Sequence, residues 1–205
     1  MLEAAGRPWV GSIPCFAPPG FVWFGMSISE SHSPAESGVS HELFRRVMAS
    51  FVTGVTVVTT QVRGEIRGMT ANAFMSGSLE PPLCVISVAL KARMHAFLLE
   101  ADHFGISILA RGQEKLIGHF AGRPIEGLDV KYEYAGDTPL LADSNATLAA
   151  KVIARHPCGD HSLFVGHIFA LQHAHGMAPI VLHVGRLASL VHSHQQTVWP
   201  TLDFW

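Results

Sequence analysis

The sequence is poor in charge. Only 15% of its 205 residues are Asp, Glu, Lys or Arg, and the formal net charge is -2. A protein that binds nucleic acid through the phosphate backbone needs a basic surface, and this composition gives no sign of one. Hydrophobic residues make up 48% of the chain, which is enough to build the core of one ordinary domain.

Cysteine is scarce as well. Cys15, Cys84 and Cys158 form no C-x-x-C pair, and any disulfide would leave one of the three unpaired. We therefore expect free thiols in a reducing, cytoplasmic compartment. Cys158 lies near two histidines, His156 and His161, but no second cluster accompanies them, and we expect no metal site.

Long hydrophobic runs are missing. No run of about 18 apolar residues is present, so we expect no membrane span. The apolar stretch 9–26 is interrupted by prolines, which a signal peptide does not tolerate. Residues 29–38 are rich in Ser, Pro, Glu and Gly and are typical of a linker. We expect an N-terminal extension with a linker over 1–38, a folded domain over 39–192 and a C-terminal tail over 193–205.

Several signatures of catalysis are also absent. The chain has no G-x-G-x-x-G after a strand and no P-loop, so neither a Rossmann dinucleotide site nor a nucleoside triphosphate site is indicated. It has no G-x-S-x-G or H-E-x-x-H sequence, and its carboxylates are scattered. If nicotinamide binds to this chain, it binds by another route.

Hydrophobic periodicity predicts many strands and few helices. The strands outnumber the helices and do not alternate with them, which favours a mainly β protein, an antiparallel barrel with short helices at its edge. Ser40 is placed to cap the first helix. The pattern predicts helices over 43–51, 92–101 and 113–120, strands over 55–60, 66–70, 83–90, 104–109, 146–154, 162–172 and 180–190, and a long loop over 122–143.

The run Gly68-Met69-Thr70-Ala71-Asn72-Ala73-Phe74 stands out between two predicted strands. Its small residues allow a ligand to approach the backbone, and its hydroxyl and amide offer hydrogen bonds. The alternative is a polar turn in which Asn72 tolerates an unusual φ angle. The run by itself leaves both interpretations open.

This run is one of several motifs that occur in a recognisable order along the chain. They are the strand Thr53 to Thr60, the run Gly68 to Phe74, then Ser76, Ser78-Leu79-Glu80-Pro81-Pro82-Leu83, the strand Phe104 to Leu109, Gln113, Phe120-Ala121 and Gly159-Asp160-His161. This order resembles the flavin reductase family with an FMN-binding split barrel, the small reductase components of two-component flavin monooxygenases. The resemblance extends from about residue 43 to residue 190.

The resemblance implies both a fold and an activity. The fold is a split antiparallel β-barrel that forms a homodimer. The activity is that of an NAD(P)H:flavin oxidoreductase, which binds FMN or FAD, oxidises NADH or NADPH and supplies reduced flavin to a partner monooxygenase. The cofactors carry this chemistry, so the protein needs no nucleophile of its own.

The resemblance also implies site residues. His161 stands where the family has its histidine at the nicotinamide side, with Asp160 orienting it. Arg93 stands where the family often has a phosphate contact. The expected flavin contacts are Thr70, Ala71, Asn72 and Ala73, Ser87, Val88 and Ala89 on the next strand, Arg93, and Phe120 and Ala121.

Some alternatives stay open. Ala92 and Met94 replace hydroxyls that the family usually has near the phosphate, so the sequence does not decide between FMN and FAD. It does not decide between NADH and NADPH either, and no run of basic residues marks a site for a 2′-phosphate. A second hypothesis is a non-catalytic split-barrel protein that binds a flavin or a tetrapyrrole, and such a protein would not need His161. A third is an enzyme that keeps its flavin bound and reduces another substrate.

Overall fold

The computed structural model describes residues 38–188 and residue 190. The described residues from Val39 onward belong to one compact unit. The predicted N-terminal extension, nearly all of the linker and the C-terminal tail lie outside the described residues. The three domain boundaries therefore stay predictions.

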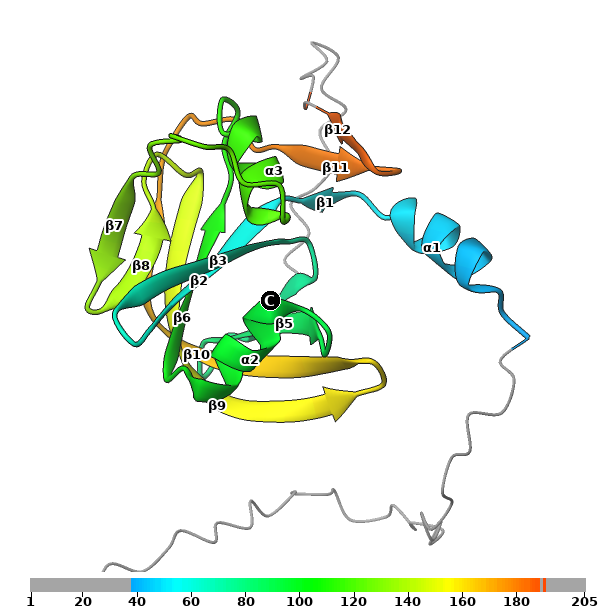
Figure 1. Cartoon of the computed structure of the whole chain (residues 1–205), viewed down its shortest axis with the longest axis horizontal. Coiled ribbons are helices and arrows are strands. Elements are labelled where there is room, and N and C mark those ends of the chain that lie inside the picture. The colour runs from blue at the N-terminus through cyan, green and yellow to red at the C-terminus, as the bar shows by residue number, and fades with distance from the viewer. Residues whose placement is uncertain (1–37, 189, 191–205) are drawn as a thin grey trace, which may run out of the picture. The chain divides into compact units, whose positions relative to one another are not determined.

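Seven strands form one antiparallel sheet, which is the main element of the fold (Figure 1). Their order across the sheet is β3-β2-β6-β9-β10-β5-β4, and every pair of neighbours is antiparallel. The strands are β2 (Thr56–Val62), β3 (Glu65–Ala71), β4 (Phe74–Ser78), β5 (Leu83–Ala89), β6 (His103–Ile108), β9 (Ala146–Cys158) and β10 (His161–His173).

This sheet bends around the main hydrophobic core. Val58 of β2, Phe104 of β6 and Phe164 of β10 pack in one buried cluster, although their strands are spread across the sheet. The helix α2 (Arg93–Glu100) adds Met94 to the same cluster. The predicted mainly β, antiparallel fold is therefore confirmed, and in the described part of the chain the edge strands β3 and β4 do not pair with each other.

The chain crosses from one edge of the sheet to the other in two residues. β3 ends at Ala71 and β4 begins at Phe74, so only Asn72 and Ala73 lie between them. The hydroxyl of Thr56 donates a hydrogen bond to the Ala71 carbonyl over 2.7 Å. The backbone N–H of Ser87 donates to the Ala73 carbonyl over 3.0 Å. The polar run is therefore held at both of its ends.

A second, smaller core lies beside α3 (Glu114–Phe120). It is formed by Val57, Leu109 and Ile180 among others. Around it stand the three-stranded sheet β1-β11-β12 and the hairpin β7-β8. These strands are β1 (Thr53–Gly54), β7 (Tyr132–Ala135), β8 (Thr138–Leu141), β11 (Val181–His183) and β12 (Arg186–Ala188).

Three sequence predictions of local structure are wrong. The loop predicted over 122–143 contains the β7-β8 hairpin, whose turn holds Gly136 at a φ of 58°. The single strand predicted over 180–190 is the hairpin β11-β12, because Val184 and Gly185 both adopt positive φ angles and reverse the chain. The strand β4 was not predicted, because Ser76, Gly77 and Ser78 make up most of it and give a weak strand pattern.

The helix α1 (His41–Ala49) begins where the sequence predicts. Ser40 caps it, and the Leu43 backbone N–H donates to the Ser40 hydroxyl over 3.1 Å. The helix is amphipathic, yet none of its residues is buried. The apolar face of α1 is therefore not covered by the described part of the chain.

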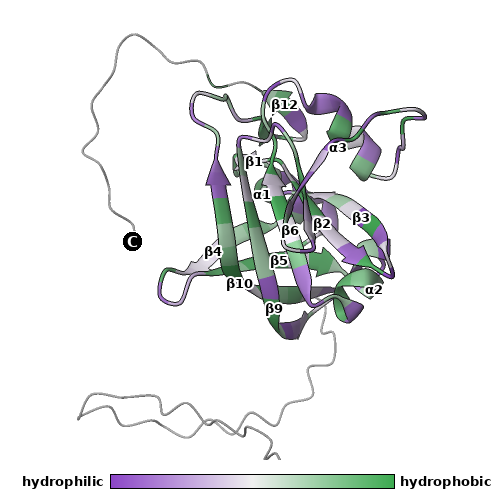
Figure 2. Ribbon diagram, turned by 90° about the vertical axis from the view of Figure 1, so that its left-hand side faces the viewer, coloured by the Kyte–Doolittle hydropathy of each residue, from purple (hydrophilic) through white to green (hydrophobic). Residues whose placement is uncertain are grey.

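Hydrophobic and polar residues form alternating bands along the strands of the sheet (Figure 2). β5 alternates strictly, with Cys84, Ile86 and Val88 buried in the core and the residues between them half-buried on the other face. Burial raises the pKa of the Cys84 thiol to about 11, so it remains an uncharged core side chain. Among the described residues, no helix has the length and apolar character needed to cross a membrane.

Candidate functional site

An apolar cleft of about 750 Å³ lies between α1 and the outer face of the sheet. Three of the predicted flavin contacts, Asn72, Ala73 and Ser87, line this cleft. Val85 and Leu163, on the outer faces of β5 and β10, also line it. The helix contributes Phe44 and Met48, and Phe51 lines the cleft from just beyond the end of the helix.

The lining fits a flavin ring. Sites for planar organic ligands are mostly apolar and carry a few polar groups that fix the orientation. Here the apolar side chains surround the amide of Asn72 and the hydroxyl of Ser87. Thr53 also lines the cleft, and its hydroxyl oxygen is buried without a hydrogen-bond partner in the protein.

His161 extends the same surface. It lies opposite Ala89 in the β5-β10 pair, and Leu163 lies opposite Ser87 two residues further on. Alternate residues of a strand point to the same face, so His161 and Ala89 share the face that forms the floor of the cleft. The His161 side chain is 40% exposed, and it is not among the residues that line the cleft itself.

Asp160 holds the ring of His161. Its carboxylate lies 2.7 Å from Nδ1 of His161. Gly159 has a φ of 59°, which reverses the chain between β9 and β10 and brings the carboxylate beside the ring. The hydrogen bond from His161, followed by the charge of that ring, holds the pKa of Asp160 below its usual value. Because a carboxylate only accepts, Nδ1 carries the hydrogen and Nε2 of the neutral ring is left as an acceptor.

Three predicted contacts point away from the cleft. The Thr70 hydroxyl donates to the Ile117 carbonyl over 2.8 Å and so joins β3 to α3. The side chain of Val88 is 1% exposed and lies in the main core. Ala71 packs against the same core. The roles of these residues as flavin contacts stay predictions, and their side chains act inside the protein.

Phe120 and Ala121 lie at the end of α3. The ring of Phe120 occupies the space in which a Cβ atom on Gly68 would stand. Ala121 caps the helix, and its N–H donates to the Ile117 carbonyl over 3.0 Å. The sequence indicated Gly68 as part of a permissive run, whereas the structure shows that an aromatic ring requires this glycine.

The predicted phosphate end of the site lies at α2. Arg93 is the first residue of this helix and is exposed. Ala92 gives the helix no side-chain cap, and Met94 is buried in the main core. Sequence reasoning missed Arg67, whose guanidinium lies 4.8 Å from the centre of the Phe97 ring. The guanidinium of Arg67 therefore stands against α2, one turn after Arg93, and it forms an ion pair with Glu65.

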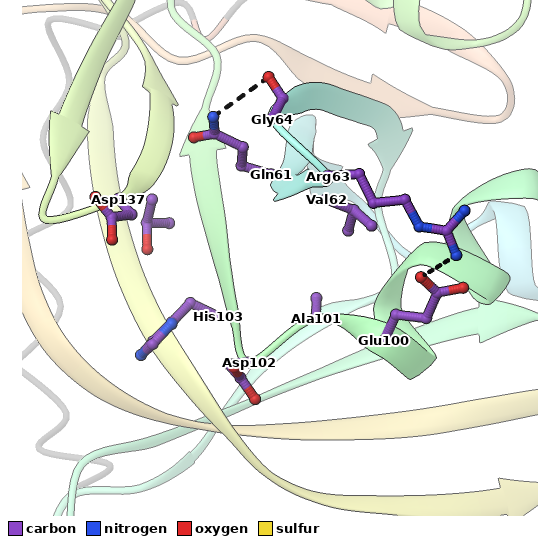
Figure 3. A pocket seen from close by; sticks show the side chains of 10 residues that line it. Gln61, Val62, Arg63, Gly64, Glu100, Ala101, Asp102, His103 and Asp137 are labelled. Atoms are coloured by element: carbon purple, nitrogen blue, oxygen red, sulfur yellow. Dashed lines mark hydrogen bonds and ion pairs between the residues drawn. The ribbon is translucent and has the colours of Figure 1, made fainter.

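A polar pocket of about 530 Å³ lies elsewhere on the barrel (Figure 3). It is formed by the β2-β3 turn, the end of α2 and the β7-β8 turn, and an ion pair of 2.9 Å joins Arg63 to Glu100 beside it. None of the predicted site residues lines this pocket. Three of them, Asn72, Ala73 and Ser87, line the apolar cleft instead.

Comparison with known families gives one match over most of the chain. Residues 48–190 match the family described as the flavin reductase like domain. The matched range includes the cleft residues of the sheet together with Asp160 and His161.

Individual proteins agree with this match. The chain is 41% identical over 149 residues to an NADH-dependent flavin reductase of Rhodococcus sp, covering 71% of this chain and 84% of that protein. It is 36% identical over 160 residues to the reductase component of 4-hydroxyphenylacetate 3-monooxygenase of Thermus thermophilus, covering 78% of this chain and 99% of that protein.

A solved structure has the same fold. It is the Streptomyces globisporus NADH:FAD oxidoreductase SgcE6, in complex with NAD and FAD fragments. The TM-score is 0.69 and the sequence identity 36%, over 73% of this chain and 92% of that one.

Proposed function

Because this chain belongs to the flavin reductase like domain family, we propose that it is an NAD(P)H-dependent flavin reductase. It transfers hydride to FMN or FAD and supplies the reduced flavin to a partner monooxygenase. The observation that carries this function is the apolar cleft lined by Asn72, Ala73 and Ser87, with His161 on the same face of the sheet.

The residues of the cleft bind and orient. A bound flavin accepts hydride from nicotinamide and carries it to the oxygenase, so the protein has only to hold the two rings together. Asn72 and Ser87 supply hydrogen bonds to the ring edge, and the apolar side chains of Val85 and Leu163 exclude water from its face. The small side chain of Ala73 leaves room for close approach.

His161 positions the nicotinamide. Asp160 keeps the hydrogen on Nδ1, so the exposed Nε2 accepts a hydrogen bond from the carboxamide of the nucleotide. NADH is the nucleotide we favour, because the similar Rhodococcus protein is an NADH-dependent flavin reductase and SgcE6 is an NADH:FAD oxidoreductase. Arg93 offers a charge to the flavin phosphate, with Arg67 close to the same helix.

A second copy of the chain covers α1. Phe44, Met48 and Phe51 are 57%, 54% and 72% exposed and line one side of the cleft. A helix of nine residues is too short to be stable by itself in water and needs packing on another surface. A homodimer in which α1 packs against the partner subunit supplies that surface. We also place the protein in the cytoplasm, where the free thiols of Cys84 and Cys158 stay reduced.

An assay of NADH oxidation tests the proposed activity. The purified full chain is mixed with NADH or NADPH and with FMN or FAD, and the absorbance of the reduced nucleotide is followed. We expect oxidation that requires added flavin and saturates with it. The proposal fails if no combination exceeds the rate measured without flavin.

A second measurement separates a diffusible cofactor from a resident one. The protein is purified without added flavin, and its absorbance in the visible range is recorded. A colourless protein that responds to added flavin is a reductase of the proposed kind. A yellow protein that retains its flavin through gel filtration, and whose rate does not rise with added flavin, contradicts the transfer of reduced flavin to a partner.

A further inference from the structure

A side-chain pair joins α2 to the start of β10. Nε2 of His95 lies 2.9 Å from the Ser162 hydroxyl oxygen. The His95 ring also meets the ring of Phe164 edge to face, with 5.7 Å between the centres. Ser162 is 7% exposed and Phe164 is fully buried, so this contact lies at the boundary of the main core.

Ser162 is the residue next to His161. Because side chains alternate along a strand, His161 points to the outer face while Ser162 points inward to α2. Any rotation of the strand at this place moves both side chains together. A bond that fixes Ser162 therefore fixes the direction in which His161 leaves the strand.

The backbone pairing of β10 ends at this place. The ladder of β10 begins at His161, opposite Ala89, and the nearest bond beyond it runs from the Leu90 N–H to the Asp160 carbonyl over 3.0 Å. On its other side the partner is the exposed end of β9, which finishes at Cys158. Strand ends of this kind fray more readily than strand centres. A side-chain tie to a helix restricts this motion.

We propose that the His95–Ser162 hydrogen bond positions His161 for nicotinamide. The proposal rests on the reductase function given above. His95 and Ser162 are positioning residues, because they act through His161 and make no contact with the cleft. His95 lies two residues after Arg93, so the pair also ties the nicotinamide side of the site to the helix that carries the predicted phosphate contact.

Ser162→Ala removes the bond with little change in volume. We expect kcat/KM for NADH to fall about fivefold, as loss of one hydrogen bond in a positioning contact does, with most of the change in KM. Flavin affinity, measured by fluorescence titration, should stay within about twofold of the wild type. Ser107→Ala is the matched control, since Ser107 is also a buried serine with a single bond, to the Leu141 N–H over 2.8 Å. It should leave kcat/KM for NADH unchanged.

A double-mutant cycle with His161→Ala identifies the route. If Ser162 acts through His161, adding Ser162→Ala to His161→Ala produces no further loss of kcat/KM for NADH. An equal fivefold loss in both backgrounds overturns the proposal, as does an unchanged kcat/KM in Ser162→Ala itself. His95→Gln, whose amide nitrogen stands near the place of Nε2, should keep most of the wild-type value, while His95→Leu should not.

The set of variants also separates a loss of function from a loss of fold. Tm is measured for each of them, and if Ser162→Ala does not fold, His95→Leu and His95→Gln decide the question from the helix side. A wild type without NADH oxidation removes the reductase function and this proposal together. An active wild type with unaffected variants removes this proposal alone.

Discussion

His161 is held by one neighbour, the exposed carboxylate of Asp160. The Asp160 side chain is 91% exposed, so solvent screens its charge, and its main effect is to select which ring nitrogen carries the hydrogen. This assigns two separable tasks to the site. In the proposed function, the cleft holds the flavin and the Asp160–His161 pair faces the nucleotide.

The separation leads to a prediction for His161→Ala. We expect kcat/KM for NADH to fall by about tenfold to a hundredfold, because the contact with the carboxamide is lost, while the flavin dissociation constant stays within about twofold. Steady-state rates at varied NADH and a fluorescence titration with FMN and FAD measure the two quantities. Asp160→Asn is the milder companion variant. Loss of flavin binding in a folded His161→Ala protein would show that the roles are assigned wrongly.

The alternation of side chains along a strand explains why only some of the predicted contacts lie on the face of the cleft. The resemblance implied Ser87, Val88 and Ala89 as a contiguous group, but a strand presents alternate residues to opposite faces. Val88 therefore enters the core while its neighbours remain on the outer face. The direction of each side chain depends on which face of the sheet becomes the core, and that is a property of the packed sheet rather than of the local sequence.

At the scale of elements, the contact between α3 and β3 requires a residue without a Cβ atom at position 68. The ring of Phe120 lies where a Cβ atom of residue 68 would be, and the Thr70 hydroxyl binds the Ile117 carbonyl beside it. Gly68 and Thr70 are two residues apart in β3, so both face α3. The run Gly68 to Phe74 therefore has a packing role on one face in addition to its place beside the cleft.

Gly68→Ala tests this packing. The added methyl group meets the Phe120 ring, and we expect the free energy of unfolding to fall by about 1–3 kcal/mol. Urea unfolding followed by circular dichroism measures the change. Gly118→Ala in α3 is the control of opposite sign, because nothing lies within 4 Å of its Cβ position and alanine favours a helix by up to about 1 kcal/mol. A Gly68→Ala protein as stable as the wild type would contradict the proposed packing.

Elements with strong periodicity were predictable, and elements made by turns were not. The strands β2, β5 and β6 and the helix α2 stand within about two residues of their predicted places, since their apolar residues repeat with the strand or helix period. The hairpin β7-β8 was missed because its turn lies in a polar segment and its strands have only four residues each. Its burial comes from contacts with distant strands, which no local pattern records.

At the scale of the whole molecule, the apolar face of α1 is the surface that most needs a packing partner, because none of the residues of this helix is buried. Apolar side chains on a short helix are stable in water only when another surface covers them. The proposed homodimer satisfies this need and closes one side of the cleft. The candidate site is then complete only in the assembled protein.

Charge on the α1 face tests the dimer. We expect Phe44→Glu combined with Met48→Glu to shift the protein from dimer to monomer in sedimentation velocity, because a carboxylate is costly to bury at an apolar contact. Flavin affinity should fall in the same variant, since both residues line the cleft. Arg45→Glu changes the charge of the same helix at an exposed position and should leave the sedimentation coefficient unchanged. A wild-type protein that sediments as a monomer would contradict the proposal directly.

The two-residue crossing at Asn72 and Ala73 limits how the protein exchanges its ligand. Three steps of about 3.8 Å between neighbouring Cα atoms separate Ala71 from Phe74, so the edges of the sheet are tethered within about 11 Å of each other at this end. The barrel cannot admit a flavin here by parting its strands. If the flavin binds as proposed, it enters and leaves along the open length of the cleft beside α1, and the proposed dimer contact on that helix would set the rate at which reduced flavin leaves.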